Sequence, residues 1–335
     1  MGWKGTLRSM QAASRRAERN AQRKQRELEK RGKEYAKMEA LEQAAYEVEV
    51  YDNYIEVLQS VHKECSEQVD WASYLARPEP REPERVASSE VAAQSRLDSY
   101  QPGFFARLFG LQQRQLASLR NAVDKGRAED SDRFKKEREA WHTEYSEWQT
   151  DYALAQRLLR GEGQAKLDAI ELLNPFEDIS MLGTSVKFVI QEGGLVEVFL
   201  SVHGDRVIPA ESKSLLQSGK LSTKKLPAGK YNELLQDYVC SCVLRVGREL
   251  LAILTDELVI VTATDRLLNT SSGHLEELPL LSVAISRRTI VSLNLDAIDP
   301  SDSMRNFVHN MSFKKTAGFA PVKALQAKDF LTATL

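Results

Sequence analysis

The chain has 335 residues, enough for about two domains of ordinary size. Its 46 Lys and Arg residues nearly balance its 48 Asp and Glu residues, and 42% of its residues are hydrophobic. This composition excludes a uniformly charged protein, a collagen-like repeat and a wholly disordered chain. Three cysteines are too few for a disulfide framework, so we expect a reducing compartment and a cytoplasmic protein. No stretch is apolar over the roughly 18 residues of a membrane-spanning helix, so we expect no transmembrane segment.

The N-terminal half has the composition of long helices. Strong helix formers dominate residues 7–173, and no glycine occurs between Gly32 and Gly103. Apolar residues recur mostly at intervals of three, four and seven over residues 38–69, which is typical of a coiled-coil seam. We therefore predict one helix over residues 9–75, about 100 Å long at 1.5 Å per residue. Three prolines between Pro78 and Pro83 would end it.

The distribution of charge suggests how the helical segments pair. Residues 1–40 carry 12 basic and 5 acidic residues, for a net charge of +7, whereas residues 41–75 carry 1 basic and 8 acidic residues, for −7. Beyond a short helix at 84–100, residues 105–138 have 9 basic and 5 acidic residues (+4), and residues 139–163 have 2 and 5 (−3). Opposite charges face each other if the chain folds back, so we predict an antiparallel helical hairpin. Self-association through this hairpin and a helix break near residues 124–131 both remain open.

The basic half of the first helix is a candidate for contact with nucleic acid. Lysine and arginine neutralise phosphates in sequence-independent binding. No aromatic residue occurs among these basic residues before Tyr35, so a solvated, charge-paired helix face is the alternative. The candidate residues are Arg15, Arg16, Arg19, Arg23, Lys24 and Arg26.

The turn of the predicted hairpin, near residues 78–110, is unusually apolar. Three phenylalanines and a leucine fall within six residues: Phe104, Phe105, Leu108 and Phe109. If exposed, such a cluster would mark a contact with a partner protein or a membrane surface. The alternative is that these side chains pack beneath the helix at 84–100.

The composition changes at Asn174-Pro175, where Val, Ile, Thr and glycine replace the helix formers. We predict a stalk over residues 1–173 and a head over residues 176–335. In the head we expect strands at 184–190, 195–202, 258–264 and 279–285, a polar loop at 213–230, a helix at 231–254 and short helices at 288–294 and 302–311. This order predicts an α+β fold with a mainly antiparallel sheet and a helix across one face.

Motifs for catalysis and cofactor binding are weak in this sequence. It contains no P-loop, no Gly-x-Gly-x-x-Gly and no Gly-x-Ser-x-Gly, so we predict no cofactor. Asp205, Glu211 and Lys213 loosely imitate the acidic residues and lysine of a metal-dependent nuclease. A second candidate metal set lies beside predicted strand ends: His203, Asp205, His274 and Glu276. Cys240 and Cys242 would point about 200° apart on a helix, which favours core packing over a shared metal.

These observations favour a non-enzymatic interaction or scaffold protein, in which a coiled-coil stalk presents an α+β binding head within a larger assembly. The partners would be other protein subunits, among which a second copy of the chain is possible. One alternative is a nucleic-acid-acting component with a basic helix and a degenerate nuclease-like head. Another is a peripheral membrane scaffold that uses the phenylalanine-rich turn. The sequence specifies neither the partner nor the oligomeric state.

Overall fold

The computed structural model describes residues 3–103, 109, 111–177, 184–191 and 193–331, and for residues 3–27 and 331 it describes the backbone only. The chain divides into two compact units, residues 1–68 with 173–335 and residues 69–172. This division differs from the predicted one, because residues 1–68 belong with the head. The predicted α+β class is confirmed, since long helices and a mixed but mostly antiparallel sheet occur together.

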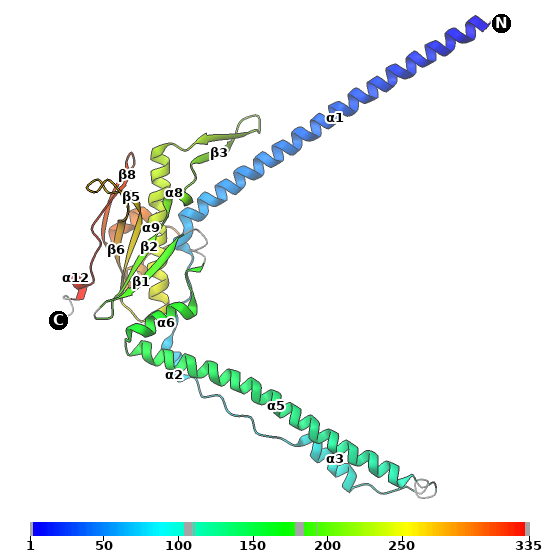
Figure 1. The fold of residues 1–335 in the computed structure, drawn as a ribbon, viewed down its shortest axis with the longest axis vertical. Helices are drawn as coiled ribbons and strands as arrows, with labels where there is room; N and C mark the ends of the chain where they lie inside the picture. The colour runs from blue at the N-terminus through cyan, green and yellow to red at the C-terminus, as the bar shows by residue number, and fades with distance from the viewer. Residues whose placement is uncertain (1–2, 104–108, 110, 178–183, 192, 332–335) are drawn as a thin grey trace. The chain divides into compact units, whose positions relative to one another are not determined.

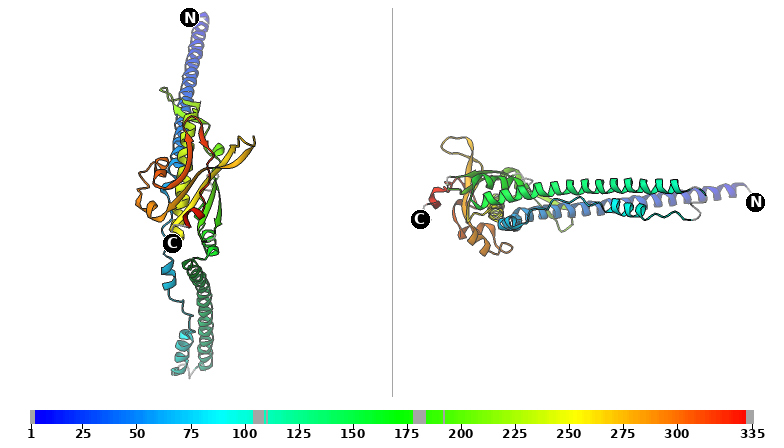
Figure 2. Two further views of the ribbon diagram at one scale, coloured as in Figure 1. Left: turned by 90° about the vertical axis from the view of Figure 1, so that its left-hand side faces the viewer. Right: turned by 90° about the horizontal axis from the view of Figure 1, so that it is seen from below.

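The head contains a six-stranded sheet in the order β1-β2-β5-β6-β7-β8 (Figure 1). All neighbouring strands are antiparallel except β2 and β5. A bulge interrupts the β5–β6 pairing between Ala263 and Thr264, opposite Pro279, which has no N–H to donate to the ladder. The strands are β1 (Ser185–Ile190), β2 (Val196–Ser201), β5 (Leu258–Leu268), β6 (Leu275–Ser286), β7 (Val308–Lys314) and β8 (Gly318–Ala320). Figure 2 shows the β5–β6 hairpin extending beyond the rest of this sheet.

A long helix, α9 (Ala228–Ile253), covers one face of the sheet and connects β2 to its parallel neighbour β5. Its apolar face is fully buried against β5, β6 and β8. Gly247 allows α9 to approach β6 closely, because a Cβ at this position would clash with Cδ1 of Ile285. Between β2 and α9 come α8 (Gly204–Val207) and a two-stranded hairpin of β3 (Glu211–Leu215) and β4 (Leu221–Lys225).

The first helix, α1 (Trp3–Ser60), belongs to the same unit as the sheet. It packs against α9, β3 and β4 and continues into a 3-10 turn, η1 (Val61–Lys63). The predicted helix over residues 9–75 is therefore too long at its C-terminal end. The structure does not confirm the antiparallel hairpin between this helix and the second helical segment, because α1 packs on α9 and the two helices belong to different units.

The second unit is built on α5 (Gln112–Leu159), which is continuous through residues 124–131. Its partners are α2 (Trp71–Ala76) and α3 (Ser88–Asp98), joined by the proline-rich segment. A further helix, α6 (Gly163–Leu173), is tied to the end of α5 by an ion pair of 2.7 Å between Arg157 and Asp168.

The proline-rich segment runs antiparallel along an aromatic row on α5. Nε1 of Trp148 donates to the carbonyl oxygen of Arg77 at 3.2 Å, and Nε1 of Trp141 donates to that of Pro80 at 3.0 Å. The two tryptophans are seven helical residues apart, a rise of about 10.5 Å, and the two carbonyl groups are three residues apart, about 9 Å in a polyproline II chain. The spacing of the donors therefore nearly matches the spacing of the acceptors. The aromatic row on α5 therefore binds an extended chain.

Close contact between α3 and α5 depends on Gly126 and Asp130. A Cβ at Gly126 would lie 2.8 Å from the carbonyl carbon and oxygen of Ser89. One turn further along α5, Asp130 accepts backbone N–H bonds from Ser89 at 3.1 Å and Glu90 at 2.9 Å. The residue before α3 is Ala87, which has no side-chain oxygen to cap the helix. Asp130 supplies that cap from the neighbouring helix.

Two predictions in the head are wrong. Residues 302–311 are not one helix, because α11 (Pro300–Ser303) and η2 (Met304–Asn306) stop after single turns and β7 follows. The predicted loop at 213–230 contains most of the β3–β4 hairpin and the start of α9. Two further short helices in the described part of the head are α10 (Arg287–Ser292) and α12 (Lys328–Leu331). Within the described part of the chain, no helix combines the length and apolarity that crossing a membrane requires.

Candidate docking surface on the first helix

One side of α1 is buried in the head. The residues that face inward include Leu41, Ala44, Tyr51, Ile55 and Leu58, which lie within about 100° of one another at 100° per residue. Leu58 is completely buried, and Ala44 is 5% exposed. The turn of the β3–β4 hairpin also reaches this side, since a Cβ at Gly219 would lie 3.0 Å from Leu41.

Polar contacts fix the same part of α1 along its length. The hydroxyl of Tyr54 donates to the carbonyl oxygen of Val207 at 2.7 Å, and Nε2 of Gln59 donates to Asp237 at 2.9 Å. Lys213 of β3 forms an ion pair of 2.9 Å with Glu47. The hydrogen bond and the positive charge from this lysine lower the pKa of Glu47. The last 20 residues of α1 are therefore attached to the head at several points.

The junction after α1 is buried and polar. His62 is 1% exposed, and its backbone N–H and Nδ1 lie 3.0 and 2.8 Å from Oγ of Ser241 on α9. Burial lowers the pKa of His62, with smaller effects from the nearby charges. Arg248 donates to the carbonyl oxygens of His62 and Lys63 at 3.4 and 3.0 Å. These contacts end α1 and hold the following chain on α9.

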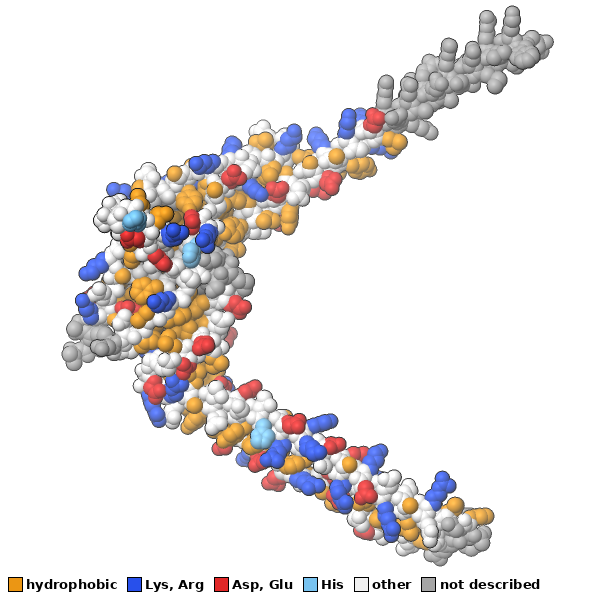
Figure 3. Space-filling model, in the orientation of Figure 1, with side chains coloured by type: hydrophobic (Ala, Val, Ile, Leu, Met, Phe, Trp, Pro, Cys, Tyr) orange, Lys and Arg blue, Asp and Glu red, His pale blue; other side chains and the backbone are white. Residues whose placement is uncertain are grey.

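The opposite side of α1 carries a second row of large apolar residues, which we call the α1 stripe: Leu28, Tyr35, Tyr46, Val50 and Val57. At 100° per residue these five side chains lie within about 60° of one another, roughly opposite the buried side. Their exposures range from 47% to 70%. Every side chain from Leu28 to Ala40 is exposed. Figure 3 shows hydrophobic side chains recurring along this described part of α1.

The sequence of α1 contains a second apolar row in addition to the predicted coiled-coil seam, and this second row is the α1 stripe. The predicted seam begins at Met38 and Leu41, and most of it faces the head. A second apolar row, at intervals of 7, 11, 4 and 7 residues, is present in the same segment. The two apolar rows lie on different sides of α1, and the head covers one of them.

The basic residues proposed for nucleic-acid contact lie in the first part of α1. Arg15, Arg16, Arg19, Arg23, Lys24 and Arg26 fall within the bounds of the helix, but their side chains are outside the described part of the structure. Of the predicted phenylalanine-rich turn, Phe104, Phe105 and Leu108 lie outside the described residues, and Phe109 is 67% exposed.

The nuclease-like set is not arranged as a metal site. Glu211 and Lys213 do lie on a strand, β3, whereas Asp205 lies in α8. Lys213 is engaged by Glu47 of α1 and so serves to attach that helix. Within the described residues, no group of three or more His, Cys, Asp or Glu side chains is placed to hold a metal ion.

The second candidate metal set is also divided between elements. His203 adopts the left-handed conformation (φ 46°) before α8, which contains Asp205. Glu276 lies on β6 and accepts hydrogen bonds from Ser272 and, at 2.8 Å, from Nδ2 of Asn269, so it closes the β5–β6 turn that includes His274. Cys240 and Cys242, together with Cys65, are free thiols, and the two on α9 are completely buried.

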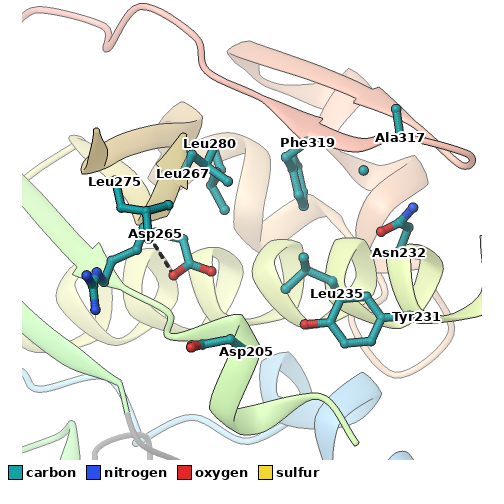
Figure 4. Close-up of a pocket in the computed structure, with 12 residues that line it drawn as sticks. Asp205, Tyr231, Asn232, Leu235, Asp265, Leu267, Leu275, Leu280, Ala317 and Phe319 are labelled. Carbon is teal, nitrogen blue, oxygen red and sulfur yellow. Dashed lines mark hydrogen bonds between the residues drawn. The ribbon is translucent and has the colours of Figure 1, made fainter. Parts of the chain in front are cut away.

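A cavity of about 290 Å³ lies between α9, the β5–β6 hairpin and β8. Figure 4 shows Asp205, Asp265 and Tyr231 around it, with Leu280 and Phe319 across the opening. Asp265 accepts the backbone N–H groups of Gly204 at 2.9 Å and Arg266 at 2.7 Å, and Tyr231 donates to the carbonyl oxygen of Gly204 at 3.2 Å. Burial and the negative charges of Asp265 and Asp205 raise the pKa of Tyr231. These polar groups therefore organise the loop before α8.

Comparison with known proteins gives no match: no protein-family model, no curated protein and no solved structure is significantly similar to this chain.

Proposed function

We propose that this protein is a non-enzymatic interaction protein whose α1 helix is a docking arm held by the α+β head. The observation that carries the proposal is the presence of two apolar sides on one helix. One side is buried on α9 and the β3–β4 hairpin, and the other, the α1 stripe, is exposed. We place this coiled-coil-type contact in a cytoplasmic protein assembly, consistent with three free cysteines.

Leaving the α1 stripe in water is energetically unfavourable, and this drives association. Burying apolar surface contributes about 25 cal/mol per Å², so several adjacent aromatic and aliphatic side chains provide a substantial driving force. Single exposed apolar residues are common on protein surfaces, but several large ones on one side of a helix indicate an interaction site. The attachment of residues 41–62 to the head means that this row is presented on a fixed support.

The test compares two variants of the full chain, each carrying two glutamines on exposed positions of α1. The stripe variant is Tyr46→Gln with Val50→Gln, and the control variant is Lys33→Gln with Glu34→Gln, which leaves the net charge unchanged. The wild type and the two variants are each immobilised and exposed to an extract of the native cells and to the purified wild-type chain. We expect the wild type and the control to retain a specific protein, and the stripe variant to lose it.

The proposal is wrong if the immobilised wild type binds neither the purified chain nor an extract protein in a way that the stripe variant abolishes. Salt-sensitive retention on DNA or RNA that disappears in Arg15→Glu, Arg16→Glu, Arg19→Glu would instead favour the nucleic-acid alternative. Nucleic-acid binding is tested because residues 1–40 carry a net charge of +7.

A further inference from the structure

We infer that the α1 stripe binds a second copy of the chain, with the two α1 helices packed antiparallel about a two-fold axis near residues 42 and 43. This inference rests on the proposed function, because it names the occupant of the same docking surface. Three features support a second copy: the spacing of the stripe, the sizes of its side chains and the charges beside it.

Four of the five stripe residues occupy mirrored positions, and the fifth, Tyr46, mirrors Glu39. Leu28 and Val57 are equally distant from the midpoint at residue 42.5, as are Tyr35 and Val50. An interface between two identical chains related by a two-fold axis must be complementary to itself, so each residue needs a partner at the mirrored position. In the antiparallel pair, each of these four residues meets an apolar partner, which an unrelated protein would not require.

The side-chain sizes also match at the mirrored positions. The large Tyr35 would face the small Val50 of the second copy, and Leu28 would face Val57. Near the axis, Tyr46 would lie beside Met38, which is 57% exposed at the margin of the stripe. Facing large with small side chains allows helices to approach to the usual 8–10 Å. The contact would extend over 30 residues, or about 45 Å.

The charges beside the stripe favour the antiparallel direction. Residues 28–42 carry four basic and four acidic residues, for a net charge of zero, whereas residues 43–57 carry four acidic residues and none that are basic. A parallel pair would place one −4 segment beside the other, which is repulsive. An antiparallel pair places each −4 segment beside the neutral one and brings Arg31 level with the segment between Asp52 and Glu56 of the second copy. Flanking charges of this kind determine the direction of helix pairing.

The test uses cysteine pairs that distinguish direction, in full-length chains that carry Cys65→Ser. One chain carries Leu28→Cys and another carries Val57→Cys, and the chains are oxidised separately and then as a mixture. We expect a disulfide-linked dimer only in the mixture. The control pair is Lys33→Cys with Asp52→Cys, which has the same mirrored spacing but lies away from the stripe and should give no such link.

The alternative outcomes are separable. Disulfide-linked dimers of each single variant alone would show a parallel pair and overturn the inference. Absence of links from both the mixture and the single variants, with a solution mass of one chain, would exclude a second copy. In that case, a protein from the native extract that is lost with Tyr46→Gln and Val50→Gln would leave the docking function in place with a different partner. If the wild-type chain neither self-associated nor bound any other protein through the stripe, both proposals would be overturned.

Discussion

His62 is held neutral in a buried junction, and this position makes the stability of the head depend on pH. Burial lowers its pKa below the ordinary value of 6.5, and the positive charges of Lys63 and Arg248 act in the same direction. The backbone of Leu295 and the carboxylate of Asp296 oppose the shift without reversing it. Because the unfolded chain binds a proton more readily than the folded chain, protonation favours unfolding.

We therefore expect the contribution of neutral His62 to be complete above about pH 6.5 and to be lost as the pH falls below that value. Urea midpoints for the wild type and His62→Gln, measured at pH 7.5 and 5.5, test this prediction. The wild type should lose more stability between the two values than the variant does. Equal losses would mean that His62 titrates in the folded chain as it does in the unfolded one.

At the scale of elements, the packing of α3 on α5 depends on the absence of a side chain at Gly126. Gly→Ala inside an exposed helix ordinarily stabilises by about 1 kcal/mol. At Gly126 the added methyl group would meet the backbone of Ser89 at 2.8 Å, so the two helices must separate. We expect Gly126→Ala to destabilise the second unit by about 1–3 kcal/mol, as in other overpacked contacts.

The matched control is Gly32→Ala, because Gly32 also lies inside a long helix but has nothing within 4 Å of the added Cβ. Thermal unfolding followed by circular dichroism should show a lower transition for Gly126→Ala and no loss for Gly32→Ala. If both variants were at least as stable as the wild type, α3 and α5 would not approach this closely at Gly126 and Ser89 in solution.

Elements with a strong local pattern could be predicted from the sequence. Four expected strands and one expected helix are confirmed, and most of their ends agree to within a few residues. They are the strands at 184–190, 195–202, 258–264 and 279–285 and the helix at 231–254. The strand β7 is not predicted, because its sequence, Val308–Lys314, is polar at most positions and its only strong requirement is pairing with β6 and β8. Such pairing is a tertiary effect that local propensity does not encode.

At the scale of the whole molecule, the helical content could be predicted, whereas the partners of the helices could not. The charge pattern is satisfied equally well by several antiparallel pairings, and it does not show that α1 packs on α9. The three prolines predict the end of a helix, but they do not predict that the segment binds Trp141 and Trp148. Both apolar rows of α1 are present in the sequence, but which of them is exposed follows only from the side of α1 that the head covers.

The most direct test of the central claim is the solution mass of the full chain, measured by sedimentation equilibrium over a range of concentrations. We predict reversible formation of a dimer by the wild type and by Lys33→Gln with Glu34→Gln, and a single chain for Tyr46→Gln with Val50→Gln. An unchanged dimer in the stripe variant, or a wild type that stays monomeric and binds no other protein, would contradict the claim.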